Sequence, residues 1–232
     1  MPFFLGLLIA PVGFYIRSHL DETHTAESHA PSPLGTLFRD HGGLVVKGVL
    51  TIIGGTVGTY LVIYFMPTYM IRELHLPASL SLLAGCVTGF TSFAASLVSG
   101  CLADRLARRK PLVVGAILFT VAVLYPAFWL MTHYPSVPLV LALSALLTTS
   151  LYLGTTPLLL MMMELLPIKV RASGLSVIYA IGVTVFGGSC QFVVTWLLAR
   201  TGNPLSPAFY MMACSAVTLL TVLSVREVRE AH

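Results

Sequence analysis

Long apolar runs alternate with short polar stretches along this chain, and the lengths of the runs predict the fold. A helix that crosses a lipid bilayer needs about 20 mostly apolar residues. Six runs reach this length, and we expect spans at 44–70, 76–103, 111–131, 137–162, 172–199 and 207–225. Each run stops at a charge cluster or a proline turn. The pattern therefore predicts a six-helix transmembrane bundle over residues 44–225.

The first 43 residues follow a different pattern. The apolar run 3–16 would rise only about 21 Å as a helix, which is short of a hydrocarbon core of ~30 Å. It has no basic residue before it and no small-residue cleavage site, so residues 1–16 resemble a short or truncated membrane helix more than a signal peptide. Residues 17–43 are rich in Ser, Pro, His and acidic side chains and predict a loop, with room for a short amphipathic helix at 34–38. Residues 226–232 predict a polar tail.

The spans are expected to be helices because lipid cannot hydrogen-bond free backbone groups. The alternative is a closed barrel, which needs strands of about ten residues with alternating apolar side chains. No such alternation is present in the sequence. The predicted fold class is therefore an all-α, polytopic transmembrane helical bundle.

Composition supports a surface that faces lipid. Hydrophobic residues make up 56% of the chain and charged residues 9%, whereas soluble domains carry about 25% charged residues. The mean hydropathy is +0.89. So few charges cannot cover a water-soluble surface.

The net charge is +4, and the placement of the basic residues indicates the orientation of the chain in the membrane and not a nucleic-acid partner. The basic residues lie in short loops between apolar runs and do not gather on one polar face, so we expect no nucleic acid to bind. Arg72 and Arg200 lie on one side of the predicted membrane. The other side carries Arg17, Arg39, Lys47, Arg105, Arg108, Arg109, Lys110, Lys169, Arg171, Arg226 and Arg229. By the positive-inside rule this basic side is cytoplasmic, and the C-terminus with it, in a plasma membrane such as the bacterial inner membrane.

Metal and cofactor chemistry find no support in the sequence. The four cysteines fall inside apolar runs without a C-x-x-C pair, and the histidines lie mostly in loops. Such cysteines pack as small hydrophobic residues. We expect no metal, no cofactor and no catalytic residue, because an intramembrane enzyme would need a nucleophile and a base at membrane depth.

The most specific motif joins the second and third predicted spans. Residues 100–111 have the sequence GCLADRLARRKP. Gly100 would let a neighbouring helix approach, and Asp104 and Arg108 stand four apart, as in a helical ion pair. Arg108–Lys110 would anchor the loop on the cytoplasmic side. An ordinary basic loop explains this spacing less well.

This motif resembles the G-x-L-x-D-R-x-x-R-R-K signature of the major facilitator superfamily, with Ala107 where the family usually has glycine. Members of that family have twelve helices in two six-helix halves, and the signature recurs between helices eight and nine. Four predicted spans follow it here. The resemblance therefore implies the second half of such a transporter, with residues 1–16 as helix six, 17–43 as the cytoplasmic central loop and 44–225 as helices seven to twelve.

Two further segments resemble the metabolite:proton symporters of that superfamily, which carry citrate, dicarboxylate, shikimate or proline and betaine. They are the opening PFFLGLLIAPVGFYIRSHLDET and residues 164–188, ELLPIKVRASGLSVIYAIGVTVFGG. The resemblance implies a cytoplasmic charge network of Glu164, Arg171, Asp104 and Arg108 that steadies the inward-closed state. Its gating residues would be Gly100, Asp104, Arg105, Arg108, Arg109, Glu164 and Arg171. Without the resemblance, solvated loop charges are the better explanation of Glu164, Lys169 and Arg171.

Polar residues at four-residue spacing mark candidate substrate contacts, because a polar group is favourable beside a cavity and unfavourable in lipid. The candidate cavity lining is Thr56, Tyr60, Tyr64, Tyr152, Thr155, Thr156, Tyr179 and Gln191, with Thr148 at the same spacing as Tyr152. By the resemblance, helices seven, ten and eleven flank the cavity. Each residue taken singly fits helix packing equally well, since Thr hydroxyls often bond their own backbone.

The resemblance implies proton-coupled symport of a small polar or anionic metabolite by alternating access. No Asp, Glu, Lys or Arg lies mid-membrane in a predicted span, so the coupling residue is expected in an N-terminal half that this chain would need for transport. Two other hypotheses remain: a non-transporting, truncated remnant, or a seven-span receptor.

Overall fold

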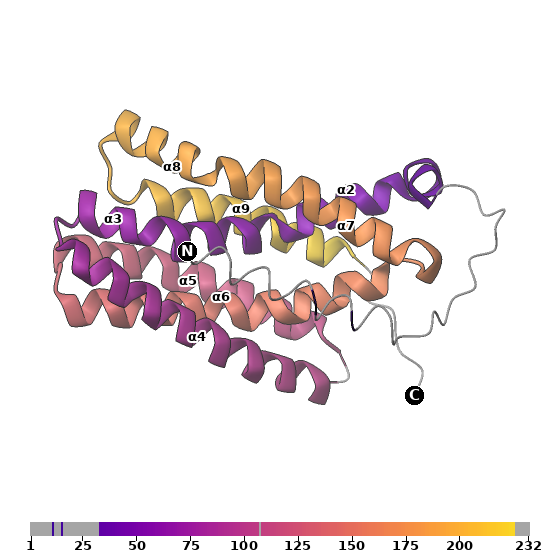
Figure 1. Ribbon diagram of the computed structural model, residues 1–232, viewed down its shortest axis with the longest axis horizontal. Helices are drawn as coiled ribbons and strands as arrows, with labels where there is room; N and C mark the ends of the chain where they lie inside the picture. Colours follow the sequence, from indigo (N-terminus) through magenta and orange to yellow (C-terminus); the bar gives the residue numbers. More distant parts are fainter. Residues whose placement is uncertain (1–10, 12–14, 16–32, 107, 226–232) are drawn as a thin grey trace. The chain divides into compact units, whose positions relative to one another are not determined.

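The computed structural model describes residues 11, 15, 33–106 and 108–225 (Figure 1). The chain divides into two units, Met1–Ser32 and Pro33–His232. The architecture below is that of the second unit. The predicted helix at 1–16, most of the predicted loop and the tail at 226–232 lie outside the described residues, apart from Pro11 and Tyr15.

The second unit contains six helices that are long and apolar enough to cross a membrane. They are Leu37–Arg72, Ala78–Arg105, Lys110–His133, Val137–Leu165, Arg171–Thr201 and Ser206–Ser224. No strand occurs among the residues that the structure describes. This confirms the all-α bundle and the six predicted spans, whose boundaries mostly lie within three residues of the observed ones.

The first span consists of three consecutive elements, α2 (Pro33–Thr59), the π-helix η2 (Tyr60–Phe65) and α3 (Met66–Arg72). Helix α2 begins at Pro33, whereas the apolar run predicted a span from residue 44. Its backbone is non-helical at His41, with φ of −128° and ψ of 17°. Gly42 and Gly43, which have low helix propensity, follow this kink directly. A short helix therefore precedes the span proper and is joined to it through the kink.

The fifth span has the same composite construction. It begins after the 3₁₀ turn η3 (Ile168–Val170) with α7 (Arg171–Ile181), passes through the π-helix η4 (Gly182–Gly187) and ends with α8 (Gly188–Thr201). The remaining spans are regular helices: α4 (Ala78–Arg105), α5 (Lys110–His133), α6 (Val137–Leu165) and α9 (Ser206–Ser224). Single π-helical turns inside α-helices are rare and frequently occur at functional sites.

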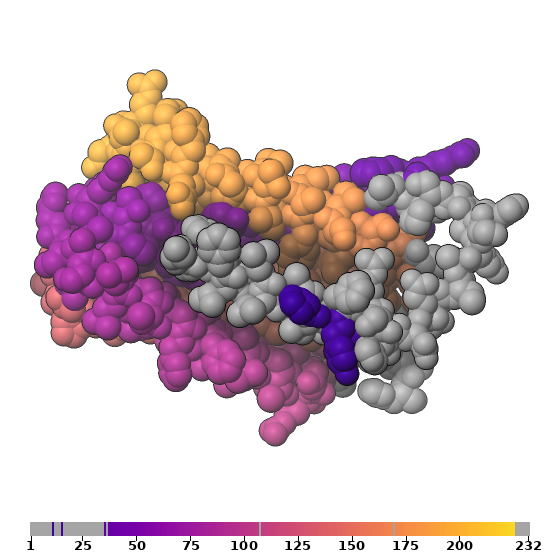
Figure 2. Space-filling model, viewed as in Figure 1, coloured from indigo at the N-terminus to yellow at the C-terminus, as the bar shows by residue number. Residues whose placement is uncertain are grey.

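Helix α2 lies in the middle of the bundle, against α9, α7, η4 and α6, and α4 and α5 both pack on α6. Helices α4 and α8 form opposite edges of the unit (Figures 1 and 2). The hydroxyl of the buried Ser99 in α4 donates to the carbonyl of Leu153 in α6 at 2.8 Å. Interhelical hydrogen bonds of this kind help to hold membrane helices together, because in lipid no hydrophobic effect drives one helix against another.

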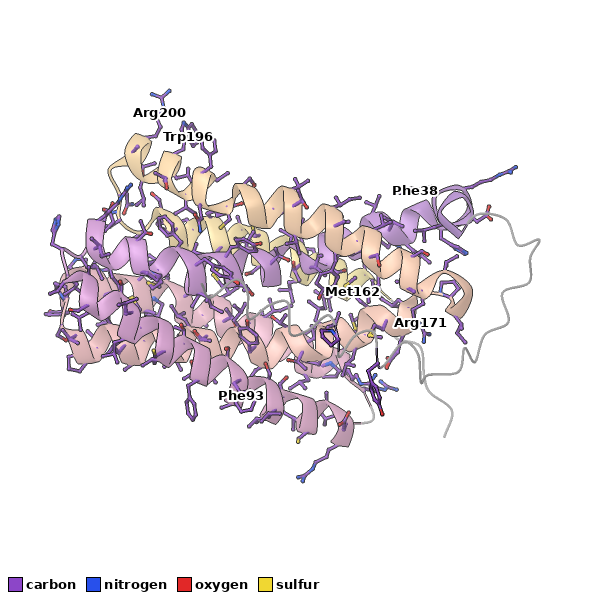
Figure 3. All side chains as sticks on the ribbon, in the orientation of Figure 1. Phe38, Phe93, Met162, Arg171, Trp196 and Arg200 are labelled. Carbon is purple, nitrogen blue, oxygen red and sulfur yellow. The ribbon has the colours of Figure 1, made fainter. Side chains whose placement is uncertain are left out.

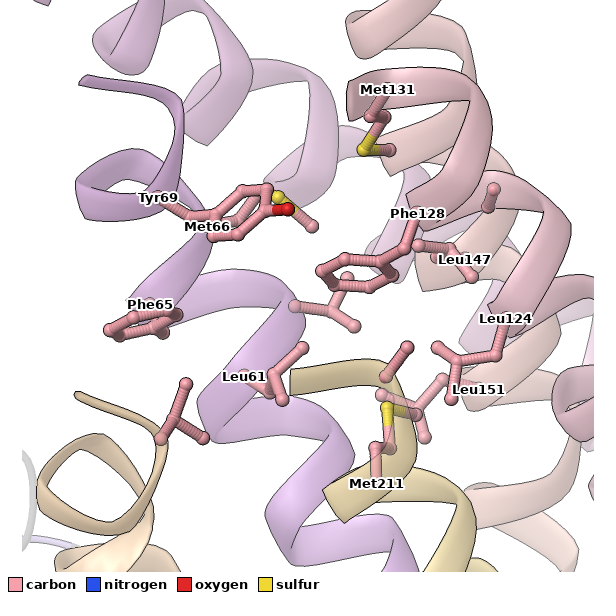
Figure 4. Close-up of a cluster of buried hydrophobic side chains, with 14 of the residues drawn as sticks. Leu61, Phe65, Met66, Tyr69, Leu124, Phe128, Met131, Leu147, Leu151 and Met211 are labelled. Atoms are coloured by element: carbon pink, nitrogen blue, oxygen red, sulfur yellow. The ribbon is translucent and has the colours of Figure 1, made fainter. Parts of the chain in front are cut away.

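An aromatic and aliphatic core lies around η2, α3 and α5 (Figure 4). The rings of Tyr69 and Phe128 meet edge to face with 5.4 Å between their centroids. The Tyr69 hydroxyl donates to the carbonyl of Pro204 at 2.8 Å, which ties α3 to the loop before α9. Dense packing and a satisfied hydroxyl fix this end of the first span.

The edges of the unit expose large apolar side chains. In α4, Phe90 is 73% and Phe93 is 64% exposed, and Trp196 of α8 is 52% exposed. Phe93 and Trp196 point away from the bundle (Figure 3). These surfaces suit contact with lipid or with further transmembrane helices.

The antiparallel spans place the charged loops at two ends. Arg171 and Arg200 lie at opposite ends of the unit (Figure 3). The end that carries Arg105, Arg108, Arg109, Lys110 and Arg171 is called the basic end below. The structure thus separates the basic residues of this unit as the sequence predicts.

Candidate functional site

A polar face runs along the first span. Tyr60 and Tyr64 both belong to η2, four positions apart. Their ring centroids lie 5.2 Å apart, with a 49° angle between the ring planes. Tyr64 is 57% exposed, while Tyr60 and Thr56 are half-buried. The predicted four-residue stripe is therefore continuous and opens outward at Tyr64.

Tyr152 of α6 completes this face from a second helix. Its hydroxyl lies within hydrogen-bonding reach of the Thr59 side chain and close to Tyr64. Thr59 also donates its hydroxyl proton to the carbonyl of Gly55 at 2.9 Å. The structure brings together Tyr60, Tyr64 and Tyr152, which we call the tyrosine face.

The fifth span closes the face from the other side through Gly187. A Cβ atom added to Gly187 would lie 2.6 Å from Cε2 of Tyr60 and 3.0 Å from Cγ2 of Thr56. A side chain at this position would therefore displace the tyrosine ring. Gln191 is exposed one turn further along α8, on the same side of the helix as Gly187. Gln191 thus lies beside the tyrosine face.

Tyr179 does not belong to this group. It is half-buried in α7, twelve residues before Gln191, which is about 18 Å along a helix. One small ligand cannot contact both side chains. The two therefore do not pair around one ligand, and Tyr179 is a candidate for a separate position closer to the basic end.

The polar residues of α6 point in different directions. Thr148 is fully buried and donates to the carbonyl of Ser144 at 2.8 Å, so it lies inside the bundle in spite of its spacing. Thr155 donates to Leu151 at 2.9 Å, and Thr156 to Tyr152 at 3.3 Å. The spacing alone did not distinguish interior from exterior positions because α6 packs against both α4 and α5.

Thr155 also lines a small, partly open cavity of about 30 Å³ between α2, α5, α6 and α9. The other hydroxyl residues of its lining are Thr120, Ser215 and Thr218, and the rest of the lining is glycine and apolar side chains. A cavity of this size has room for one water molecule. Tyr60, Tyr64 and Tyr152 do not line it.

The tyrosine face carries hydroxyl groups and rings but no charge. Its helices contain no Asp, Glu, Lys or Arg near their middle. Across the part of the chain that the structure describes, no group of three or more His, Cys, Asp or Glu side chains could hold a metal ion. The face therefore presents hydroxyl groups and aromatic rings.

The basic end contains an ion pair between Arg109 and Glu164, both half-buried. It joins the loop after α4 to the last turn of α6. Nearby, Nε of Arg171 donates to the carbonyl of Leu166 at 3.2 Å. Nζ of Lys110 donates to the carbonyls of Leu223 and Val225 at 3.0 and 2.6 Å. Polar contacts therefore tie together the start of α5 with the ends of α6 and α9, and the start of α7 with the end of α6.

Two geometric expectations about the motif at 100–111 are wrong for this unit. Helix α4 ends at Arg105 and Leu106 is extended, so Asp104 and Arg108 do not share the helix that their four-residue spacing requires. A Cβ atom added to Gly100 would meet nothing within 4 Å, so no neighbouring helix of the unit approaches it. Asp104, Arg105 and Arg108 are exposed. Arg109, and not Arg108, pairs with Glu164.

Sequence reasoning missed Thr59, Gly187 and both π-helices. The run GTVGTY around Thr59 fits helix packing as well as a site, and FGG at 186–188 was noted only as part of the segment that resembles the symporters. A π-helical turn leaves no simple sequence pattern. Only the packing of the first span on the fifth shows that these residues shape the tyrosine face.

Comparison with known proteins agrees with this geometry. Residues 15–231 match the family described as Sugar (and other) transporter. The citrate-proton symporter of Klebsiella pneumoniae is 31% identical over 226 residues, which cover 95% of this chain and 50% of that protein. The putative proline/betaine transporter of Staphylococcus aureus (strain COL) is 30% identical over 234 residues, 96% of this chain and 49% of that protein.

A third relative, the ectoine/proline transporter ProP of Corynebacterium glutamicum, is 26% identical over 247 residues, 98% of this chain and 48% of that protein. The chain spans about half the length of the curated relatives it matches, and the match lies in their C-terminal half. No solved structure gives a significant match. These relatives are transporters, which supports a role other than catalysis.

Proposed function

Because the chain belongs to the sugar (and other) transporter family of the major facilitator superfamily, we propose that it forms the second six-helix half of a proton-coupled symporter for a small polar or anionic metabolite. The relatives named for citrate, for proline and betaine, and for ectoine support such a substrate. A second half of this kind acts together with a first half, and the two halves transport solute by alternating access around a central site.

One observation carries the proposal: a polar, uncharged face inside the first span, made by Tyr60, Tyr64 and Tyr152. Tyr64 is 57% exposed, although it lies within the first span, which runs from Leu37 to Arg72. A polar side chain that faces lipid is unfavourable, so an exposed polar side chain within a span indicates a cavity or a substrate pathway. A first half packed over this face would convert it into one wall of a substrate cavity.

The candidate cavity lining follows from this placement. Tyr60, Tyr64, Tyr152 and Gln191 would contact substrate, with Thr56 and Thr59 supporting them. Thr156 would line the same wall closer to the basic end, whereas Thr155 would contact substrate only through the small cavity between α2, α5, α6 and α9. Tyr179 would contact substrate only when the cavity opens toward the basic end.

The basic end would face the cytoplasm, since Lys and Arg gather there, and the C-terminus would lie on that side. The Arg109–Glu164 pair would hold the start of α5 and the end of α6 together while the cavity is closed to the cytoplasm. Gly100, Asp104, Arg105 and Arg108 are exposed or face no helix of this unit, so we propose that they dock on the first half. Arg171 would steady the start of α7.

Co-reconstitution tests this proposal. The purified chain is placed in liposomes alone, or with the separately produced first half of the Klebsiella relative or of the Staphylococcus relative, and uptake of labelled citrate and glycine betaine is measured. We expect uptake above empty liposomes only when both halves are present. Uptake by neither combination, with both halves shown by circular dichroism to be folded, would favour a non-transporting remnant.

A further inference from the structure

A second cavity lies at the basic end of the unit, between α2, α6, α7 and α9. Its volume is about 340 Å³, compared with about 30 Å³ for the cavity between α2, α5, α6 and α9. Pockets that hold small ligands begin at about 300 Å³. Residues from all four helices line it, among them Lys47, Thr51, Met162, Ile178 and Ser224. We call it the basic-end cavity, and it shares no residue with the tyrosine face.

Most of the lining is apolar. Apart from Gly48 and three polar side chains, it consists of leucine, isoleucine, valine and methionine. Two of the polar side chains are hydroxyls bonded to their own helices. The Thr51 hydroxyl donates to the carbonyl of Lys47 at 2.7 Å, and Ser224 likewise donates within α9. The third is Lys47 itself, whose ammonium group has three N–H donors and no acceptor. A ligand that matches this lining has an apolar body and an end that accepts hydrogen bonds.

Basic side chains hold two walls of the basic-end cavity. Nε of Arg171 donates to the carbonyl of Leu166 at 3.2 Å. Nζ of Lys110 donates to the carbonyl of Val225 at 2.6 Å. Both Leu166 and Val225 line the cavity. Among the residues that the structure describes, Lys47 has no ion-pair partner. Its charge is therefore available to a ligand.

Acidic side chains do not offset this charge. None lines the basic-end cavity among the described residues. Glu164 is paired with Arg109, and Asp104 is exposed on α4, which contributes no residue to the lining. Asp40 precedes the kink at His41 and does not line the cavity. The charged groups that line or hold the cavity are positive, so the polar end of a matching ligand is an anion.

The surface beside the cavity is apolar. Val46, next in sequence to Lys47, is 59% exposed, and Leu223, next to Ser224, is 53% exposed. Exposed apolar side chains on a membrane helix suit contact with lipid. A lysine near the end of a span extends its charge toward the head groups while its stem stays on apolar surface. A ligand from the bilayer therefore meets apolar surface next to Lys47.

We propose that the basic-end cavity binds an anionic phospholipid of the adjacent leaflet. The lipid phosphate pairs with the ammonium group of Lys47, and part of one acyl chain enters the cavity against Met162 and Ile178. Basic pockets between membrane helices on the cytoplasmic side bind lipid head groups in this way. The inference goes beyond the proposed function, because the ligand is a component of the membrane and not the transported metabolite.

Three probes test the chemistry of the ligand. Dioctanoylphosphatidylglycerol has a net negative charge and acyl chains, dioctanoylphosphatidylcholine has the chains without the net charge, and glycerol 3-phosphate has the charge without the chains. Each is titrated into the purified full chain in detergent, and bound lipid is measured by native mass spectrometry. We expect phosphatidylglycerol to bind about threefold to tenfold more tightly than phosphatidylcholine, and glycerol 3-phosphate to bind more weakly than both.

A pair of charge variants identifies the contact. Lys47→Gln removes the charge in the cavity and is expected to weaken phosphatidylglycerol binding about threefold to tenfold. Arg39→Gln removes one exposed charge from the same helix, before the kink and outside the lining, and serves as the matched control with unchanged binding. Because a ligand of the folded state stabilises it, phosphatidylglycerol should also raise the unfolding temperature of Arg39→Gln more than that of Lys47→Gln.

Photocrosslinking locates the acyl chain. A phosphatidylglycerol with a diazirine in its acyl chain is irradiated with the full chain, and the crosslinked peptides are sequenced by mass spectrometry. We expect crosslinks to Met162, Leu165 or Ile178, which line the cavity, and a lower yield in Lys47→Gln. Crosslinks spread evenly over the apolar surface would show general solvation by lipid and would overturn the inference.

Further results would overturn it as well. Equal binding of the two phospholipids would remove the role of charge, and equal effects of Lys47→Gln and Arg39→Gln would remove the role of Lys47. Glycerol 3-phosphate that binds as tightly as phosphatidylglycerol would indicate a site for a free anion. No binding by a chain shown to be folded would indicate that another part of the protein fills the cavity. Each of these results leaves the co-reconstitution experiment unaffected, since that experiment measures transport.

Discussion

Thr218 of α9 places its hydroxyl across one turn of α2. Its Oγ1 accepts a hydrogen bond from the Gly54 N–H at 2.8 Å and donates to the Leu50 carbonyl at 3.2 Å. These two backbone groups would pair with each other in a regular α-helix. A side chain inserted in the ladder in this way marks a point where a helix can bend, and Gly54 and Gly55 lie at that point. The small, partly open cavity lined by Thr155 adjoins this point.

Replacing Thr218 by Val is expected to loosen α2 at this turn. The change keeps the shape of the side chain and removes both hydrogen bonds, at a cost of about 0.5–1.5 kcal/mol in unfolding free energy. Hydrogen exchange of residues 50–55 should accelerate. Thr221→Val is the control, because Thr221 donates to Val217 of its own helix. Mass spectrometry measures the hydrogen exchange, and thermal unfolding measures the stability. Equal effects of the two variants would show that Thr218 has no special role in α2.

Gly187→Ala is expected to disturb the tyrosine face. The new Cβ atom would lie 2.6 Å from the Tyr60 ring, so the ring or the fifth span must shift, at a cost of about 1–3 kcal/mol. The neighbouring Gly188→Ala meets nothing within 4 Å and should be neutral or slightly stabilising. Thermal unfolding in detergent compares the two. A destabilised Gly188→Ala with an unaffected Gly187→Ala would contradict the packing described here.

The Arg109–Glu164 pair predicts rescue by exchange of charges. In the chain combined with a first half, Arg109→Glu or Glu164→Arg alone places like charges together and should lower transport severalfold without loss of membrane insertion. The double variant restores an opposite-charge pair and should recover part of the rate. Asp104→Asn tests the exposed carboxylate separately. Additive losses in the double exchange would show that the pair does not act as a unit.

Gln191 is expected to affect substrate affinity and not stability. The amide is exposed beside the tyrosine face, so Gln191→Ala removes a polar contact and leaves the packing unchanged; we expect a change of about threefold to tenfold in apparent affinity. Leu220→Ala, at an apolar site that is 68% exposed, is the control. Uptake titrations in the co-reconstituted system measure both, and indistinguishable results for the two would favour a packing or lipid-facing role for Gln191.

The sequence predicted the spans well because hydropathy and charge report directly on the bilayer. The predicted first span begins at residue 44, where the apolar run begins. The helix itself begins at Pro33, because polar residues before the His41 kink continue it outside the apolar run. Four-residue spacing found Tyr60 and Tyr64 together. The same spacing included Thr148, which is fully buried, because spacing gives the face of a helix but not its neighbours.

The motif at 100–111 was recognised from its residues, but its contacts were not. The end of α4 at Arg105 breaks the helical spacing of Asp104 and Arg108, and Ala107 occupies the position where the family usually has glycine. The pairing of Arg109 with Glu164 joins residues 55 positions apart. Such a contact depends on how α4, α5 and α6 pack, and no local pattern reports it.

The most direct test of the central claim is a proton-flux measurement. Liposomes that contain a trapped pH-sensitive dye and the chain with a first half are given substrate outside. We predict internal acidification that requires substrate and both halves, is absent with the chain alone, and disappears with a protonophore. Substrate uptake without proton movement, or acidification driven by the chain alone, would contradict the account of this chain as the second half of a proton-coupled symporter.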